Sequence, residues 1–173
     1  LEPERTYENY KTRGFQTPTG KFEFRSTAME QAGADPLPSW QEPPETPASN
    51  PSLSAQYPLI LTTGGRQQPY FVSNNRQIRS LRKLEPFPIV TMHPDTAAQY
   101  GIAEGDWVWI ENQRGRITQK AHLDSDMARN VINAQFGWWY PEAGAPDYGW
   151  RESNANILTS AAPPYDHYLG SYQ

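Results

Sequence analysis

The chain has 173 residues, a formal net charge of −4 at pH 7 and no cysteine. This length fits one domain with an appendage, and the mildly acidic balance argues against binding to a nucleic-acid backbone or an anionic membrane. Without cysteine the segment excludes disulfides, thiolate metal sites, iron–sulfur clusters and cysteine nucleophiles. Seventeen prolines and 13% aromatic residues favour a mainly β or loop-rich domain with few long helices.

Composition divides the chain into three parts. Residues 1–33 are a polar lead-in, residues 34–56 a proline-rich linker, and residues 57–173 the main domain. Polar and apolar residues alternate from Lys21 to Arg25, which predicts a short strand with both phenylalanines facing inward. Because the chain starts with Leu-Glu rather than Met, we expect it to be a piece of a longer protein.

The main domain is predicted to open with a buried strand in the segment YPLILTTGGR, residues 57–66. Glycines allow close approach of a ligand to the backbone, and successive N–H groups in such a turn can converge on an anion. An arginine directly after the turn adds a fork of donors. The alternative is that the two glycines simply turn the chain. Candidate residues for a phosphate or a polar ring edge are Thr63, Gly64, Gly65 and Arg66.

A short basic helix is predicted from Arg76 onward, after three residues that are good helix caps. Arg76 and Gln77 lie nearest the cap and are candidate ligand contacts. Arg82 and Lys83 are interpreted as a solvated helix face.

Alternating strands and turns follow, with predicted strands at 88–92, 107–110, 116–123 and 131–136 and a short helix that opens at His93-Pro94. Period-two alternation places Val108 and Ile110 on one face and two tryptophans on the other. We interpret both faces of this strand as buried, and the alternative is that the two tryptophans form a platform for carbohydrate.

Two further segments carry candidate binding groups. Gly137 and Trp138 begin a run in which three consecutive aromatic residues cannot all face one core, so some are expected to line a groove. Asn154 and Asn156 offer both donors and acceptors, as the edge of a heterocyclic ring requires. Capping or turn formation is the alternative role for these asparagines.

This ordered set of motifs resembles the C-terminal dinucleotide-binding domain of molybdopterin oxidoreductases of the dimethyl sulfoxide reductase and formate dehydrogenase type. The resemblance runs from about Thr17 to about Gln173. It is carried by TPTGKFEF in the lead-in, by the Gly-Ile-x-x-Gly-Asp-x-Val segment at 101–108, and by Asn-x-Asn followed by Leu158-Thr159. The implied fold is mainly β: a six-stranded double-psi β-barrel with short helical crossovers, of the aspartate decarboxylase-like kind.

The resemblance implies that the domain clamps a bis-molybdopterin guanine dinucleotide carrying Mo or W, while the redox chemistry belongs to the full enzyme. No catalytic residue and no metal ligand is expected in this segment, so the isolated domain should be inactive and can lack the cofactor. The cofactor-binding residues implied are Thr63, Gly64, Gly65, Arg66, Arg76, Gln77, Gly137, Trp138, Asn154 and Asn156.

Related sequences often carry histidine where this chain has Val72, Asn74 or Asn75, which argues against a proton-transfer role for this loop. The partners implied are upstream domains of the same chain, with iron–sulfur and membrane-anchor subunits of the full enzyme, and neither nucleic acid nor direct membrane contact. A prokaryotic cytoplasm or periplasm would fit.

Two other functions fit the residues. A non-enzymatic β-barrel module could bind protein or glycan through its aromatic side chains and its proline-rich segment. A standalone accessory subunit could bind the cofactor in trans.

Overall fold

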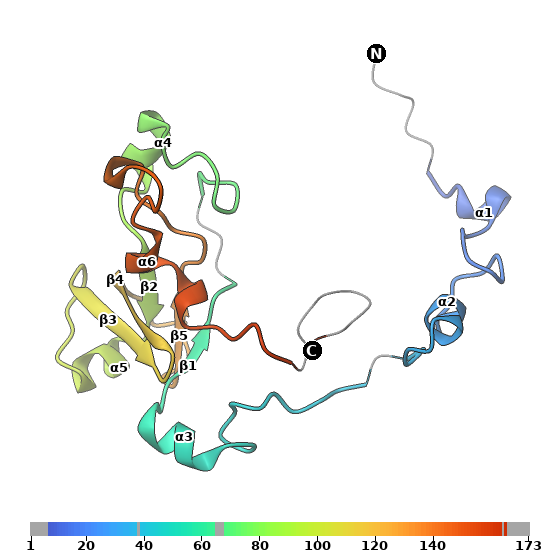
Figure 1. The fold of residues 1–173 in the computed structure, drawn as a ribbon, viewed down its shortest axis with the longest axis horizontal. Helices are drawn as coiled ribbons and strands as arrows, with labels where there is room; N and C mark the ends of the chain where they lie inside the picture. The colour runs from blue at the N-terminus through green and yellow to red at the C-terminus, as the bar shows by residue number, and fades with distance from the viewer. Residues whose placement is uncertain (1–6, 38, 65–67, 164, 166–173) are drawn as a thin grey trace. The chain divides into compact units, whose positions relative to one another are not determined.

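The computed structural model describes residues 7–37, 39–64, 68–163 and 165, which fall into two units (Figure 1). The larger unit comprises residues 45–162 and holds the sheet and the hydrophobic core. The smaller unit draws on residues 1–44 and 163–173. In the part of the chain that the structure describes, no helix has the length and apolar character needed to cross a bilayer.

The larger unit is built on one curled, mixed sheet in the order β1-β5-β2-β4-β3 (Figure 1). β1 pairs parallel with β5 and β2 pairs parallel with β4, whereas β2–β5 and β3–β4 are antiparallel. The domain is therefore mainly β with short helices, as predicted. The strands are β1 (Ile60–Thr62), β2 (Ile89–Met92), β3 (Trp107–Asn112), β4 (Gly115–Leu123) and β5 (Val131–Ala134).

Short helices connect the strands, and local capping explains where two of them begin. The side chain of Asn50 accepts from the N–H of Leu53 at the start of α3, inside the proline-rich segment predicted to be extended. His93 caps α5 in the same way, as expected from His93-Pro94. The helices of this unit are α3 (Pro51–Gln56), α4 (Arg79–Leu84), α5 (Pro94–Gln99), η1 (Pro141–Ala143), α6 (Trp150–Ser153) and η2 (Ala155–Ile157).

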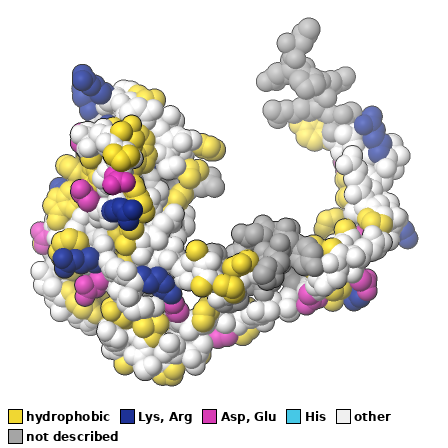
Figure 2. Space-filling view, viewed as in Figure 1, with side chains coloured by type: hydrophobic (Ala, Val, Ile, Leu, Met, Phe, Trp, Pro, Cys, Tyr) yellow, Lys and Arg dark blue, Asp and Glu magenta, His cyan; other side chains and the backbone are white. Residues whose placement is uncertain are grey.

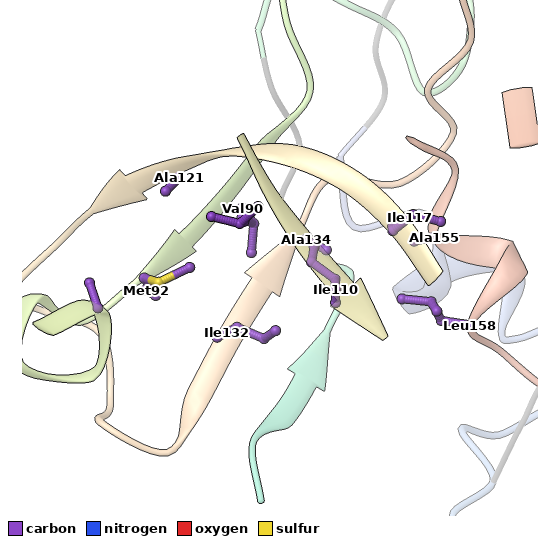
Figure 3. Close-up of a cluster of buried hydrophobic side chains, with 11 residues drawn as sticks. Val90, Met92, Ile110, Ile117, Ala121, Ile132, Ala134, Ala155 and Leu158 are labelled. Carbon is purple, nitrogen blue, oxygen red and sulfur yellow. The ribbon is translucent and has the colours of Figure 1, made fainter. Parts of the chain in front are cut away.

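The core lies inside the curl of the sheet, where β2, β3, β4 and β5 each contribute alternate side chains (Figure 3). Val90 of β2 and Ile117 of β4 are fully buried, and Leu158 closes the same cluster from the segment after η2. Burying such aliphatic side chains contributes about 1.5–3 kcal/mol each. The core comprises Val90, Met92, Ala97, Val108, Ile110, Ile117, Ala121, Ile132, Ala134, Ala155 and Leu158.

The first predicted strand of the main domain forms, but it is not buried. β1 is an edge strand and Ile60 is 41% exposed. A short apolar run does not distinguish a buried central strand from an edge strand that is covered on one face, because both contain apolar residues.

The strand predicted from Lys21 to Arg25 does not form. Phe22 is 62% exposed and Phe24 84% exposed, so neither faces inward. The ring of Phe22 contacts the rings of Phe24 and Phe15 edge to face. No described residue of this unit offers a partner strand, and a lone strand leaves its backbone unpaired. The helices of this unit are α1 (Tyr10–Arg13) and α2 (Thr27–Gln31).

The two faces of β3 differ in burial. Val108 and Ile110 point into the core, as predicted. Burial of the opposite face was a wrong prediction, since Trp107 and Trp109 are 48% and 60% exposed. Arg116 lies 4.3 Å from the Trp109 ring centroid, so a cation already occupies one face of this ring. Figure 2 shows hydrophobic and charged side chains interspersed on the visible face of the larger unit.

Candidate functional site

The helix predicted from Arg76 begins three residues later, at Arg79, with Ile78 at its N-cap and no side-chain cap. Arg76 therefore belongs to the loop before α4. Its side chain turns inward and the residue is only 1% exposed. One guanidinium nitrogen, Nη1, donates to the carbonyl of Val72 at 3.1 Å. The loop thus folds around a buried cation rather than presenting it to solvent.

The buried guanidinium lies against two aromatic rings. The Cζ atom of Arg76 is 4.8 Å from the Tyr70 ring centroid and 4.7 Å from that of Trp138, which is itself fully buried. The two rings meet edge to face at 5.9 Å. Two of the predicted site residues, Arg76 and Trp138, therefore come together from segments about sixty positions apart in sequence.

A second arginine joins this group, against prediction. Arg82 was interpreted as solvated, yet its Cζ lies 4.9 Å from the Trp138 ring centroid and 5.7 Å from that of Tyr140. Its Nη2 forms an ion pair with Glu142 at 2.9 Å. Lys83 is exposed, as predicted. We call Tyr70, Arg76, Arg82, Trp138 and Tyr140 the arginine–aromatic cluster.

The cluster holds buried donors that lack acceptors. Arg76 Nε and Nη2, Arg82 Nη1 and Trp138 Nε1 have no hydrogen-bond partner, and within the described residues no other buried side-chain nitrogen or oxygen shares this condition. Each such group costs about 1–3 kcal/mol when it is left unpaired, and more when it is charged. Because a whole domain is stable by only about 5–15 kcal/mol, four unpaired donors in one place are a costly concentration that requires an explanation.

The electrostatics of the cluster favour an anion or a group rich in acceptors. Burial lowers the pKa of Arg76 to about 10, and the charge of Arg82 adds to this effect. Arg76 therefore remains protonated at neutral pH. Burial also raises the pKa of Tyr70 and of Tyr140, so both phenols stay neutral. Among the described residues, Glu142 is the carboxylate that forms an ion pair in this cluster, and its partner is Arg82.

Gly137 brings the chain after β5 against the loop that carries Arg76. It has φ +65°, and a Cβ there would meet the Cβ of Ser73 at 3.2 Å. The indole Nε1 of Trp139 donates to the carbonyl of Ser73 at 2.6 Å. A side chain at position 137 would thus strain the backbone and push the two segments apart. Close packing of the segments therefore explains the glycine at this position.

A buried amide fixes the segment that leads to Trp138. Gln119 of β4 is fully buried, and its Nε2 donates to the carbonyls of Gln135 and Ser153 at 2.8 and 3.0 Å. Ser153 Oγ in turn lies 2.6 Å from the hydroxyl of Tyr140. Sequence reasoning missed this role, although an amide at an inward position between Ile117 and another core residue was a visible signal.

The two asparagines of the Asn-x-Asn motif differ in their surroundings. Asn154 is half-buried, and its side chain accepts from the N–H of Asn156 at 3.0 Å, which is the turn-forming role. Asn156 is exposed in η2. No hydrogen bond or ring contact between described residues joins either one to the arginine–aromatic cluster.

The remaining predicted residues are more dispersed. Thr63 is half-buried and Gly64 exposed just after β1, and Gln77 is exposed in the loop before α4. Gly65 and Arg66 lie outside the described residues. Within the described ranges, no three His, Asp or Glu side chains gather as a metal ion would require.

Comparison with known proteins gives a consistent match. The profile of the family described as "Molydopterin dinucleotide binding domain" matches residues 59–171, well over half of the chain. Dopamine dehydroxylase of Eggerthella lenta is 43% identical over 159 residues, which cover 90% of this chain and 15% of that protein. The dimethyl sulfoxide/trimethylamine N-oxide reductase of Rhodobacter capsulatus is 31% identical over 150 residues, covering 83% of this chain and 18% of that protein.

Among solved structures, acetylene hydratase from Pelobacter acetylenicus superimposes with a TM-score of 0.76 and 35% sequence identity. The match covers 87% of this chain and 21% of that chain. The present chain thus spans only about a fifth or less of the proteins it resembles.

Proposed function

Since this chain belongs to the molybdopterin dinucleotide-binding domain family, we propose that it clamps a bis-molybdopterin guanine dinucleotide carrying Mo or W within a larger oxidoreductase. Its matches include proteins named as a dehydroxylase, a reductase and a hydratase. Because these names describe different reactions, the shared domain is better tied to the cofactor than to any one substrate. The cofactor, when bound, supplies the redox chemistry.

The observation that carries this proposal is the set of unpaired donors in the arginine–aromatic cluster. A pterin ring offers nitrogen and carbonyl acceptors, and a dinucleotide adds phosphate oxygens. Arg76 supplies two unpaired donor nitrogens and a charge, and Trp138 supplies one unpaired N–H beside it. These donors fit such a group in number and sign. Gly137 would keep the backbone after β5 close to the loop at Ser73, and Asn156 would add an exposed amide.

The less direct parts of the proposal rest on the family resemblance. We propose that Thr63, Gly64, Gly65 and Arg66 contact phosphate or pterin, and that Gln77 and Asn154 add polar contacts. We keep the division into lead-in 1–33, linker 34–56 and barrel 57–173, and the six-stranded double-psi barrel as the complete fold. Upstream domains of the same chain, with iron–sulfur and membrane-anchor subunits, are the partners we propose.

The test uses the enzyme that carries this domain. Mo, W and guanine nucleotide are measured per chain in the parent protein and in variants Arg76→Met and Trp138→Phe. Because each variant removes a donor that has no partner within the domain, we expect nucleotide retention to fall by tenfold or more for Arg76→Met, about 1.4 kcal/mol. Matched controls are Arg79→Met on α4 and the exposed Trp109→Phe on β3. Equal retention in all four variants would refute the proposal.

A binding module for protein or glycan makes the opposite prediction. Its aromatic platform would be the outer face of β3, where Arg116 already lies over Trp109 and Lys120 lies 5.8 Å from the Trp107 ring centroid. Stacking of a sugar on these rings would have to displace the cations. That function would be favoured if Trp109→Phe lost protein or glycan binding and if this binding did not depend on bound guanine nucleotide.

A further inference from the structure

We propose that the tip of the β3–β4 hairpin positions the segment that carries the Asn-x-Asn motif, and that Glu45 in the proline-rich segment latches this hairpin in place. Asn112 and Arg114 are the positioning residues, because they hold the carbonyl of Leu158, two residues after Asn156. The effect of this latch on cofactor retention rests on the proposed function, in which Asn156 contacts the pterin. The test below separates the latch from that function.

Asn112, the last residue of β3, uses both ends of its side-chain amide. Its Oδ1 accepts from the N–H of Arg114 at 2.9 Å, which fixes the side chain across the two-residue turn between the strands. Its Nδ2 donates to the carbonyl of Leu158 at 2.7 Å. Leu158 is the C-cap of η2, where carbonyl groups lack partners within the helix. The hairpin therefore supplies the donor that the end of this turn requires.

A glycine on the other side of the hairpin turn allows the close approach. Gly115 pairs with Asn112 in the sheet. A Cβ at position 115 would lie only 3.0 Å from the Cγ2 atom of Ile157, well inside the usual separation of about 3.5–4.0 Å between carbon atoms. Any other residue at this position would push η2 away from the hairpin. The bond from Asn112 to Leu158 depends on this contact.

Arg114 adds a second donor to the same carbonyl and is itself held by Glu45. Its Nη1 donates to the carbonyl of Leu158 at 3.4 Å and to Glu45 Oε2 at 3.0 Å, and its Nη2 donates to Glu45 Oε1. Gln113 Nε2 also donates to Glu45 Oε1, at 3.2 Å. Because both carboxylate oxygens engage the guanidinium group, the pair fixes orientation as well as charge. The side chains of Arg114 and Glu45 are 25% and 40% exposed, so solvent screens this pair only partly.

The latch matters for the motif because nothing else among the described residues orients Asn156. The side chain of Asn156 is exposed and has no hydrogen bond to a described residue, so its direction follows the backbone of the turn. The buried side chain of Leu158 anchors this turn at one point. The hairpin bonds to the Leu158 carbonyl fix the peptide plane as well. A binding group is held accurately only when such neighbouring hydrogen bonds fix its support.

The first test follows amide hydrogen exchange of residues 155–158 by mass spectrometry in the enzyme that carries this domain. Asn112→Asp keeps the acceptor for Arg114 but loses the donor to Leu158, so we expect exchange to become about tenfold faster. Glu45→Ala should speed exchange about fivefold, equivalent to about 1 kcal/mol. The matched control is Arg116→Met, which removes a neighbouring cation that lies over Trp109 and should change exchange by less than about twofold.

A double variant tests whether Glu45 acts through Arg114. If it does, Glu45→Ala adds nothing to exchange in an Arg114→Met background, and Arg114→Lys restores part of the protection because it keeps the charge without the fork. Additive effects of Glu45→Ala and Arg114→Met would refute the latch. Parental exchange in Asn112→Asp, at a parental urea midpoint, would refute the positioning role of Asn112.

The second test measures guanine nucleotide per chain in the same variants of the enzyme. We expect Asn112→Asp and Glu45→Ala to retain about threefold less nucleotide than the parent. Since nucleotide loss itself can speed exchange, Asn156→Ala is the control that loses the proposed pterin contact and keeps the hairpin bonds. Exchange as fast in Asn156→Ala as in Asn112→Asp would overturn the positioning role. A parent enzyme without nucleotide would refute the proposed function, while the double variant would still decide the latch.

Discussion

Gln119 of β4 and Gln135, which follows β5, are joined by two hydrogen bonds between side chain and backbone. Gln119 Nε2 donates to the carbonyl of Gln135 at 2.8 Å, and Gln119 Oε1 accepts from its N–H at 3.0 Å. The same Nε2 reaches the carbonyl of Ser153 at 3.0 Å. One buried amide thus ties the strand that forms the core to both segments that carry predicted site residues, the one before Trp138 and the one before Asn154.

Gln119→Leu should therefore be strongly destabilising. Leucine has a similar size but leaves the carbonyls of Gln135 and Ser153 buried without this donor, which we expect to cost about 2–4 kcal/mol of unfolding free energy. Urea denaturation followed by circular dichroism measures the change. The matched control is Gln99→Leu on α5, at an exposed position, which should stay within about 0.5 kcal/mol of the parent. A similar small change at both positions would show that the amide is dispensable.

The strands of the larger unit were predictable from the sequence, the strand expected from Lys21 to Arg25 does not form, and the candidate site was only partly predictable. Alternation in β3 and β4 assigned Val108 and Ile117 to the core correctly, because period-two patterning depends on local sequence alone. The cluster depends on contacts between segments far apart in sequence. The prediction for Arg82 was wrong for this reason. The local sequence indicates a solvated helix and carries no signal that Trp138 lies against Arg82. The exposed face of β3 was misjudged because periodicity does not reveal what covers the outer surface of a sheet.

Arg76→Met should leave the stability of the unliganded chain nearly unchanged or raise it. The substitution removes a buried charge with two unpaired donor nitrogens. It also gives up the hydrogen bond to the carbonyl of Val72 and the contacts with Tyr70 and Trp138, which together contribute about 2 kcal/mol when desolvated. These effects nearly cancel, so we expect the unfolding free energy to stay within about 1 kcal/mol or to increase. A loss above about 2 kcal/mol in urea denaturation would instead identify Arg76 as a structural residue.

Val72→Gly should stabilise the unliganded chain. Glycine adopts φ +54° without the steric cost that valine pays, and the gain of about 1 kcal/mol exceeds the added entropy of the unfolded chain. Asn75 has φ +73° in the same loop, but asparagine tolerates this region, so Asn75→Gly should change stability by only a few tenths of a kcal/mol. Differential scanning calorimetry compares the two variants. Equal effects would argue against localised strain at Val72.

Glu104 should give the domain a pH-dependent stability at its β4 end. Its carboxylate accepts from the N–H of Leu123 at 2.7 Å and lies 3.1 Å from His122 Nδ1, and these hydrogen bonds lower its pKa. A lowered folded-state pKa means that the stabilisation is complete above the ordinary pKa of glutamate and is lost as the pH falls through the folded-state value. We expect Glu104→Gln to be less stable than the parent at pH 7, by under about 1 kcal/mol, and the difference to shrink as the pH falls below the ordinary pKa of glutamate. Paired urea titrations at pH 7 and across the acid range check this, and a difference that does not shrink in acid would contradict it.

Asn154 and Asn156 allow the turn-forming role to be separated from a cofactor contact. The side chain of Asn154 bonds the N–H of Asn156, so Asn154→Ala should lower the unfolding free energy by about 0.5–2 kcal/mol, the usual cost of losing such a cap. Asn156 is exposed, and its side chain has no hydrogen bond to a described residue, so Asn156→Ala should leave stability unchanged. If its amide contacts the pterin, the enzyme carrying Asn156→Ala should retain several-fold less guanine nucleotide, in line with about 1 kcal/mol for one hydrogen bond. The motif would be only a structural turn if Asn156→Ala retained all of its guanine nucleotide and if the nucleotide lost in Asn154→Ala matched the lower stability of that variant.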